Sequence, residues 1–384
     1  GAASFGSRAG RIFLSISADF SNDKVEYFSV VNSARLCYNE HAQFTQQRSI
    51  SMTNRDRFLA VLNGKKPDDR LPVVEWASWW DLTLNRWHGE GLDPALTGDE
   101  LFRALDLDVL RQFWFHHTAP GCPQPASHGA AIMEDEGDYE KLRPFLYPEH
   151  ANDGMLEEMR RIAPMHEKGD ITLWYTLEGA FWFPRTLFGI EGHLYSFYDY
   201  PELYHQILDD LANWQIRLLD KVYAVCTPDF MTFAEDMSYN NGPMISKEIF
   251  DEFLAPYYRR MAAYVRSHGT RAIIDSDGDI TMMVPWLQSV GLEGILPLEC
   301  QAGVNIPRLR TLFPDFILIG GFDKMVMKNG EEAMRAEFER ILPVMKSGHY
   351  VPGVDHQTPP DVSLENYHIY VRLLHEYARR AMEE

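Results

Sequence analysis

The chain has 384 residues, of which 45% are hydrophobic, and a formal charge of −20. This length and composition are sufficient for one large domain with a full core, so no second domain is needed. The negative charge and the lack of basic runs argue against nucleic acid or an anionic membrane as a partner, because both are bound by Lys and Arg.

Residues 1–51 differ from the rest of the chain, being Ser-rich and mixed in pattern, and Met52 follows them. The stretch 53–58 then opens an amphipathic helix. One interpretation is that Met52 is the natural start and that the preceding residues are an upstream extension. The other is a genuine N-terminal arm that covers the floor of the fold or a partner subunit. We therefore expect an N-terminal extension in 1–51 and one folded domain in 52–384.

Eight short apolar runs punctuate the domain, and nearly all of them end in an acid or a histidine. Most are followed by a helix-like stretch, which predicts a single-domain (β/α)8 TIM barrel of class α/β, with its chemistry at the carboxyl ends of the strands. A doubly wound sheet would also alternate, but no glycine-rich phosphate loop follows the first strand. The runs are residues 71–75, 109–117, 171–178, 230–236, 272–277, 294–299, 316–323 and 350–356.

Helices are predicted between the later runs. Residues 202–225 carry apolar side chains at helical spacing after Pro201, whose missing N–H costs nothing at a helix start. Ser246 is a suitable N-cap for the next helix, and Gly269 a suitable stop. Three more amphipathic stretches complete the set, at residues 306–313, 331–346 and 364–382.

Prolines and glycines interrupt any periodicity in residues 118–148. We interpret this stretch as a long insert over the barrel mouth after the second strand, within which residues 130–139 could form a hairpin. Loops of this length often serve as lids.

Four cysteines lie far apart without a C-x-x-C spacing, so neither a disulfide framework nor a zinc ribbon is indicated. No apolar stretch approaches the roughly 20 residues that span a bilayer, and no leader-like pattern is recognisable. We expect a soluble protein of the reducing cytoplasm, and the sequence is compatible with an oligomer.

The densest group of acids is at the end of the fifth run, where Asp275, Asp277 and Asp279 fall within five residues. Alternation along a strand points Asp275 and Asp277 to the same face. Two carboxylates held that close raise the pKa of one of them or recruit a cation. Asp279 is better explained as the cap of a helix beginning at Ile280. His356 ends the eighth run, and its place at a strand end favours a role in the same site.

At these residues the chain resembles the uroporphyrinogen decarboxylase superfamily, from about Arg55 to the C-terminus. This superfamily contains decarboxylases of heme synthesis and corrinoid-dependent methyltransferases. The likeness rests on Phe188-Gly189-Ile190-Glu191-Gly192 followed by Pro201-Glu202-Leu203, on Ser246-Lys247-Glu248-Ile249-Phe250 with Phe253, Pro256 and Tyr257, on Gly320-Gly321-Phe322-Asp323, and on residues 358–366. These motifs are specific for the superfamily and its fold, but not for the reaction.

The true decarboxylases of that family carry an arginine-rich loop after the first strand, which binds the substrate's carboxylates. The corresponding stretch here is acidic and aromatic, reading Glu75-Trp76-Ala77-Ser78-Trp79-Trp80-Asp81. The place of the family's catalytic aspartate falls near Phe115-His116-His117. Decarboxylation of uroporphyrinogen is therefore not the expected reaction.

The resemblance also implies a metal site. Coenzyme-M-type methyltransferases bind zinc through His-x-Cys at the fifth strand and a later Cys, and these positions match Asp275, Asp277 and His356. With Glu299, this set is harder and richer in oxygen than the family's ligands. Zinc is the first candidate, and another divalent ion or none is the alternative.

We therefore expect an enzyme that moves a methyl group between a small methylated compound, such as an ether, alcohol or amine, and a corrinoid. The methylcobalamin or other corrinoid would be supplied by a partner protein. A metal or a protonated carboxylate would polarise the substrate oxygen. The expected catalytic residues are Asp275, Asp277, His356, Glu299 and Glu178, with Asp236 a further acid/base candidate; the expected substrate-binding residues are Trp76, Trp79, Trp80, His116, His117, Glu235 and Asp323.

Two other functions remain open. A decarboxylase, and hence a lyase, acting on another substrate would need a cationic clamp, for which Arg185 and Arg308 are the available arginines. A non-catalytic corrinoid or tetrapyrrole carrier would be expected to carry a D-x-H-x-x-G pattern, which this chain lacks.

Overall fold

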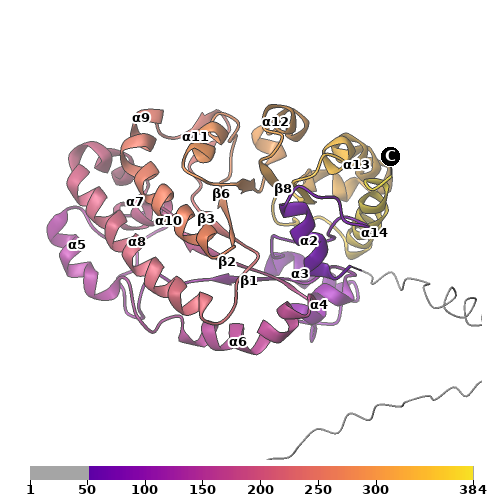
Figure 1. Cartoon of the computed structure of the whole chain (residues 1–384), viewed down its shortest axis with the longest axis horizontal. Coiled ribbons are helices and arrows are strands. Elements are labelled where there is room, and N and C mark those ends of the chain that lie inside the picture. Colours follow the sequence, from indigo (N-terminus) through magenta and orange to yellow (C-terminus); the bar gives the residue numbers. More distant parts are fainter. Residues whose placement is uncertain (1–51, 384) are drawn as a thin grey trace, which may run out of the picture. The chain divides into compact units, whose positions relative to one another are not determined.

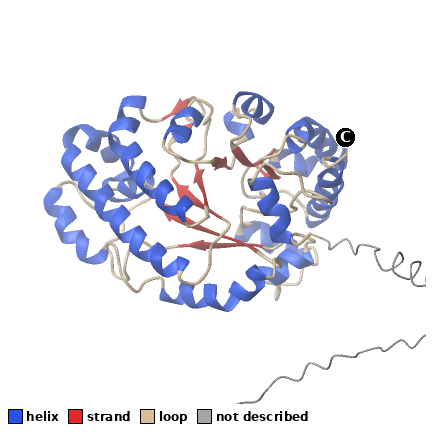
Figure 2. Cartoon of the chain, in the orientation of Figure 1, coloured by secondary structure: helices blue, strands red, loops and turns tan. Residues whose placement is uncertain are grey.

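The computed structural model describes residues 52–383, so the expectations for residues 1–51 lie outside the described part. Seven parallel strands form one curled sheet in the order β1-β2-β3-β6-β7-β8-β9, and helices surround it (Figures 1 and 2). This is a TIM-barrel-like α/β fold, as expected. The strands are β1 (Leu110–Trp114), β2 (Thr172–Glu178), β3 (Phe230–Ala234), β6 (Arg271–Asp275), β7 (Gly294–Leu296), β8 (Ile317–Phe322) and β9 (Tyr350–Val354).

The first predicted strand, residues 71–75, is fully buried but forms no ladder. Pro72 has no N–H to donate, and the Val73 N–H donates to the Asp108 carboxylate at 3.0 Å instead of to a neighbouring strand. One backbone bond, from Asp108 N to Val73 O at 2.7 Å, joins this segment to the approach to β1. On the other side, the Trp76 indole donates to Val354 O at the end of β9. Side chains thus close the gap between β1 and β9.

Most strands are buried on both faces, because helices cover the outside of the sheet and side chains fill its inside, whereas β1 exposes Gln112 and Trp114. All residues of β3, β8 and β9 are buried. The principal helices are α2 (Asn54–Leu62), α3 (Asp81–Gly89), α4 (Gly98–Ala104), α5 (Glu136–Leu142), α6 (Asp153–Glu167), α7 (Trp182–Asp199), α8 (Pro201–Tyr223), α10 (Ala255–Ser267), α11 (Val284–Ser289), α12 (Ile306–Leu312), α13 (Glu331–Met345) and α14 (Leu364–Arg380). Within residues 52–383, none of them combines the length and apolarity that crossing a membrane would require.

The predicted helices are present, with boundaries that shift by a few residues. Pro201 is the first residue of α8, and the Ser246 hydroxyl accepts the Ile249 N–H as an N-cap. The helix after Ser246 begins with one α-helical turn (Lys247–Ile249), passes through a π-helical segment (Phe250–Leu254) and continues as α10, which ends two residues before Gly269, whose φ is +86°. Asp279 accepts the Thr281 N–H at 3.0 Å, so it caps a turn, and the following helix α11 begins only at Val284.

Residues 118–148 form the insert, but the hairpin prediction within it is wrong. A bridge between Thr118 and Leu146 closes its base, and α5 occupies the part where the second hairpin strand was expected. The insert docks on a kink in α7 at Gly189, whose φ is +72°. A Cβ there would lie 2.6 Å from the Ala131 nitrogen, so the close approach requires glycine.

Glu75 should make the stability of this fold depend on pH. Its carboxylate is buried at 2% exposure and accepts the Tyr367 hydroxyl at 3.1 Å, and burial raises its pKa to about 8. The folded state therefore keeps a proton that the unfolded chain, with a pKa near 4.5, releases. The resulting stabilisation is complete below the unfolded pKa and is lost as the pH rises through about 8; at about 1.4 kcal/mol per pKa unit, the shift from 4.5 to about 8 sets an upper bound of about 5 kcal/mol on the loss.

Urea unfolding between pH 5 and pH 8.5, for wild type and Glu75→Gln, measures this contribution. The Gln variant keeps the side chain's shape but cannot titrate, so its free energy of unfolding should fall less over this range. Equal pH dependences in the two proteins would show that Glu75 does not keep its proton.

Candidate functional site

A cavity of about 270 Å³ opens at the carboxyl ends of the strands. It collects six of the residues predicted from the sequence, namely Trp76, Glu235, Asp236, Asp275, Asp277 and His356. Sequence reasoning did not single out Gln112, Trp174, Trp182 or Gln357, which complete much of its wall. None of the described residues that line it is a Lys or an Arg. The cavity is therefore acidic and aromatic.

Three carboxylates meet in this cavity. One oxygen from each of Asp236, Asp275 and Asp277 lies within 4.8 Å of the others. Asp275 is the last residue of β6, and Asp236 follows β3 with a φ of +46°, which turns the chain at this point. The Asp277 N–H lies 3.4 Å from Asp236 Oδ1. Neighbouring strand ends thus place the like charges side by side.

Burial and mutual repulsion both disfavour ionisation of this cluster. Burial, and then the charges of Asp236 and Asp277, raise the pKa of Asp275 well above its usual value. Burial, followed by Asp236 and Glu299, raises the pKa of Asp277 to about 7. At neutral pH the cluster must hold protons or a cation.

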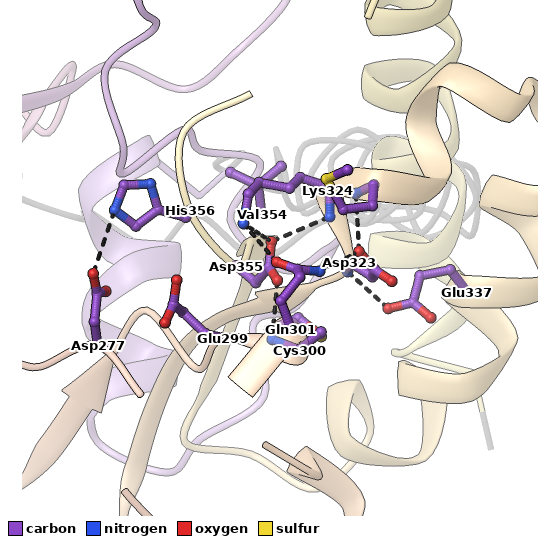
Figure 3. Close-up of polar contacts among 12 residues, drawn as sticks. Asp277, Glu299, Cys300, Gln301, Asp323, Lys324, Glu337, Val354, Asp355 and His356 are labelled. Atoms are coloured by element: carbon purple, nitrogen blue, oxygen red, sulfur yellow. Dashed lines mark hydrogen bonds and ion pairs between the residues drawn. The ribbon is translucent and has the colours of Figure 1, made fainter. Parts of the chain in front are cut away.

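His356 and Glu299 flank Asp277 (Figure 3). The His356 ring points toward Asp277, with Nε2 at 3.9 Å from Oδ2, and burial followed by the charge of Lys324 lowers the pKa of His356. Glu299 Oε2 accepts the Gly278 N–H at 3.0 Å. His356 therefore lines the cavity, whereas Glu299, predicted as a catalytic residue, lies outside the cavity lining and supports the loop after Asp277.

Asp355, next to His356, organises this side of the mouth. Its side chain is fully buried and accepts the Cys300 N–H at 3.0 Å, the Lys324 N–H at 3.1 Å and the Lys324 ammonium at 3.2 Å (Figure 3). These bonds join the loops that follow β7, β8 and β9. Asp355 thereby fixes the backbone from which His356 projects.

The loop after Asp277 depends on Gly278, whose φ is +86°. A Cβ here would lie 2.6 Å from backbone atoms of Ser238 and Tyr239.

Gly278→Ala is expected to lower the free energy of unfolding by about 2 kcal/mol, from backbone strain and displacement of this loop. Gly303→Ala is the matched control, because Gly303 has a φ of +91° but open space around it; a cost of about 1 kcal/mol is expected. Urea unfolding compares them, and equal costs would argue against the clash.

Glu235 lines the cavity, but its oxygens are already bound. It is 1% exposed and accepts the Phe181 and Trp182 N–H groups at 2.8 and 2.9 Å, together with the Tyr258 hydroxyl. The carboxylate thus holds the N-terminus of α7, where negative charge is favourable. The structure gives this predicted substrate-binding residue a supporting role.

The predicted tryptophans separate into three environments. Trp76 lines the cavity, and its ring meets His356 edge-on at 6.3 Å. Trp79, predicted to bind substrate, is buried in the core against Phe102 and Tyr367 and lies outside the cavity lining. Trp80 is 41% exposed and lies outside the cavity lining. The alternation of side chains along a strand could not predict these three environments, because residues 76–80 form a loop and not a strand.

Three other predicted binding residues also lie outside this cavity. His116 is exposed, and its backbone bonds the Asn152 side chain. His117 is 2% exposed, and burial lowers its pKa to about 3. Asp323 accepts the Met325 N–H at 2.9 Å and caps the turn after β8.

Glu178 and Arg185 lie in a second cavity, of about 320 Å³, between the insert and α7. Arg308 is exposed on α12. Neither arginine lines the acidic cavity.

The acidic cluster can act in two ways. A protonated Asp275 or Asp277 can donate to an oxygen of a bound molecule. Alternatively, the three carboxylates can hold a divalent ion, since one oxygen from each lies within 4.8 Å of the others and carboxylate oxygens are ligands for such ions. The donor set fits zinc or a harder ion.

Comparison with known proteins agrees with this architecture. A family model described as uroporphyrinogen decarboxylase (URO-D) matches residues 128–377. Uroporphyrinogen decarboxylase from Bordetella petrii is 28% identical over 193 residues, covering 46% of this chain and 51% of that protein. The same enzyme from Pseudoalteromonas translucida is 21% identical over 187 residues, covering 47% and 50%. The chain thus spans about half the length of the curated relatives it matches.

Among solved structures, a methyltransferase from Methanosarcina mazei superposes with a TM-score of 0.58 at 18% identity, covering 85% of this chain and 99% of that one. This likeness shows a shared fold. Because the family model matches more than half of the sequence, this chain belongs to the uroporphyrinogen decarboxylase (URO-D) family of enzymes.

Proposed function

We propose that this enzyme moves a methyl group between a small methylated compound and a corrinoid protein, at the acidic cavity. The observation that carries the proposal is the cluster of Asp236, Asp275 and Asp277 inside an aromatic wall with no Lys or Arg among the described lining residues. Such a cavity favours a neutral or cationic small molecule and repels carboxylates.

The same features argue against a large polycarboxylate as substrate. The cavity, at about 270 Å³, is at the small end for ligand pockets, which typically measure about 300–1,000 Å³. A porphyrinogen would bring several carboxylates next to three aspartates. Decarboxylation is the alternative function. The curated relatives are uroporphyrinogen decarboxylases, but the size and charge of this cavity argue against such a substrate.

The chain's own residues would activate the methyl donor. As the methyl–oxygen bond breaks, the electron pair stays on oxygen, and a proton from Asp275 or Asp277 neutralises it. The corrinoid supplies the nucleophile that receives the methyl group. Trp76 and Trp182 would exclude water and orient the donor. If a metal is bound, Asp236, Asp275 and Asp277 would hold it, with His356 at the edge, and it would polarise the same oxygen.

The proposal is tested by mixing the enzyme with chemically reduced cobalamin and a panel of methyl donors: methanol, methylamines and aryl methyl ethers. The visible spectrum reports methylation, and carbon dioxide release from uroporphyrinogen is measured in parallel. Methyl transfer that Asp277→Asn abolishes and Asp279→Asn retains would support the proposal. Decarboxylation with the same dependence would replace it, and a red cofactor retained through purification would favour a carrier.

Metal content provides a separate prediction. Protein purified without chelators or a histidine tag is expected to hold about one divalent ion per chain, zinc first, and an Asp277→Ala, His356→Ala double variant is expected to lose it. Mass spectrometry measures both. If the two proteins held the same amount of metal, the ion would be bound elsewhere. If neither held metal, the carboxylates would act as proton donors without an ion.

A further inference from the structure

The second cavity lies beside the acidic one, and Trp182 forms part of the wall of both. We refer to it as the insert pocket. Its outer wall comes from the insert and its inner wall from the end of β2 and from α7. Most of its surface is apolar, from Pro123, Pro125, Ile132, Leu187 and Ile190. Such a lining fits the apolar body of a small molecule.

Arg185 gives the insert pocket an unpaired cation. Its guanidinium lies over the Trp182 ring at 4.9 Å from the centroid, and the side chain is half-buried. Among the described residues, no carboxylate forms an ion pair with it. A partly desolvated guanidinium without an acceptor is costly, and its planar group binds a carboxylate through two parallel hydrogen bonds. The pocket therefore favours an anionic group at this end.

Glu178 occupies the other polar position in the pocket. Within the described part of the chain, its carboxylate makes no hydrogen bond, and its one ion-pair contact is with His117, whose Nδ1 lies 3.9 Å from Oε2. His117 Nδ1 is itself buried without a hydrogen-bond partner in residues 52–383. Burial raises the pKa of Glu178 to about 7. Glu178 is thus available to a ligand, and it does not neutralise Arg185.

We propose that the insert pocket binds an apolar molecule carrying a single carboxylate, which pairs with Arg185 while the body packs on Trp182 and Leu187. The next step rests on the proposed function. If the enzyme transfers a methyl group, the molecule in the insert pocket is the part of the methyl donor that remains after the transfer. Trp182 lies between this pocket and the acidic cavity, so a donor bound on both sides of it would present its methyl group to Asp277. The substrate would then be a carboxylated methyl compound, not a one-carbon alcohol or amine.

The test uses benzoate as the probe, with binding measured by titration calorimetry. Arg185→Met is expected to weaken benzoate binding at least about tenfold, because the charged hydrogen bonds are lost. Arg185→Lys should lie between Met and wild type, since it keeps the charge but loses the planar stack. Arg308→Met, a change on the exposed face of α12, should bind as wild type does. Thermal unfolding checks that each variant is folded.

Two results would overturn the inference. One is equal binding of benzoate by wild type and by folded Arg185→Met or Arg185→Lys. The other is benzamide, the neutral isostere, binding as tightly as benzoate. The assay involves no corrinoid and no methyl transfer, and Asp277→Asn should bind benzoate normally. Binding that depends on Arg185 without methyl transfer from any donor would retain the pocket and reject the proposed reaction.

Discussion

Replacing Asp277 with Asn is expected to lower the rate of methyl transfer by about 10²- to 10⁴-fold, the usual contribution of a positioned proton donor. Asn has nearly the same shape, so the loss would come from the missing proton or metal ligand and not from packing. The carboxylate lies 3.9 Å from His356 and within 4.8 Å of two other aspartate oxygens, so it connects the aspartate cluster to His356. The measurement is the initial rate with reduced cobalamin and the best donor.

Asp279→Asn is the matched control, because Asp279 is two residues away and accepts only a turn N–H. Its rate should stay within about twofold of wild type. If both variants lost activity equally, a general disturbance of the loop would explain the result better than chemistry at Asp277.

The pH dependence of the rate identifies which form of Asp277 acts. Burial, followed by Asp236 and Glu299, raises its pKa to about 7, so the protonated donor is present below that pH and lost above it. In chelator-treated protein the rate should therefore fall as the pH rises through about 7, and this step should be absent in Asp277→Asn. A rate that rises over the same range would indicate ionised carboxylates, as metal binding requires.

Asp229→Ala is expected to cost about 3–5 kcal/mol of stability, because it leaves the buried His166 ring and the Leu173 N–H without their acceptor and the partly buried Arg55 without its counter-charge. The fully buried Asp229 carboxylate accepts Arg55 Nε at 2.7 Å and the Leu173 N–H at 3.0 Å, and lies 2.8 Å from His166 Nε2. These contacts join α2, α6 and β2 at the end of the sheet opposite the acidic cavity. Urea unfolding should show the loss.

The control is Asp69→Ala, which removes a different ion pair from the same helix. Asp69 itself is 41% exposed, so water can replace part of its bond to the nearly buried Arg57, and a smaller cost of about 1–2 kcal/mol is expected. If the two variants lost similar free energies of unfolding, burial of Asp229 would not be the reason for the large loss expected at that residue. Reduced cobalamin methylation by folded Asp229→Ala should stay near the wild-type rate.

Most of the fold was predictable from the sequence. Runs of buried, β-branched residues alternating with amphipathic helices specify a parallel barrel, and the polar residue at the end of each run marks the mouth. This reasoning placed Asp275, Asp277 and His356 at one cavity, although they are up to 81 residues apart in the chain. It also predicted a strand at residues 71–75. This segment forms no strand ladder, because Pro72 has no N–H and the Val73 N–H donates to the Asp108 side chain.

The sequence by itself therefore determined the order of strands and helices and the acidic character of the mouth, because both follow from local periodicity. Only the tertiary structure decided which strand-end groups face the cavity. Glu235 and Asp236 are adjacent, yet one binds the backbone of α7 and the other joins the aspartate cluster, since a left-handed turn at Asp236 separates their directions. Likewise, the second cavity, which places Arg185 next to the insert, exists only because the insert packs on α7. Such assignments depend on contacts between distant segments, which no local pattern encodes.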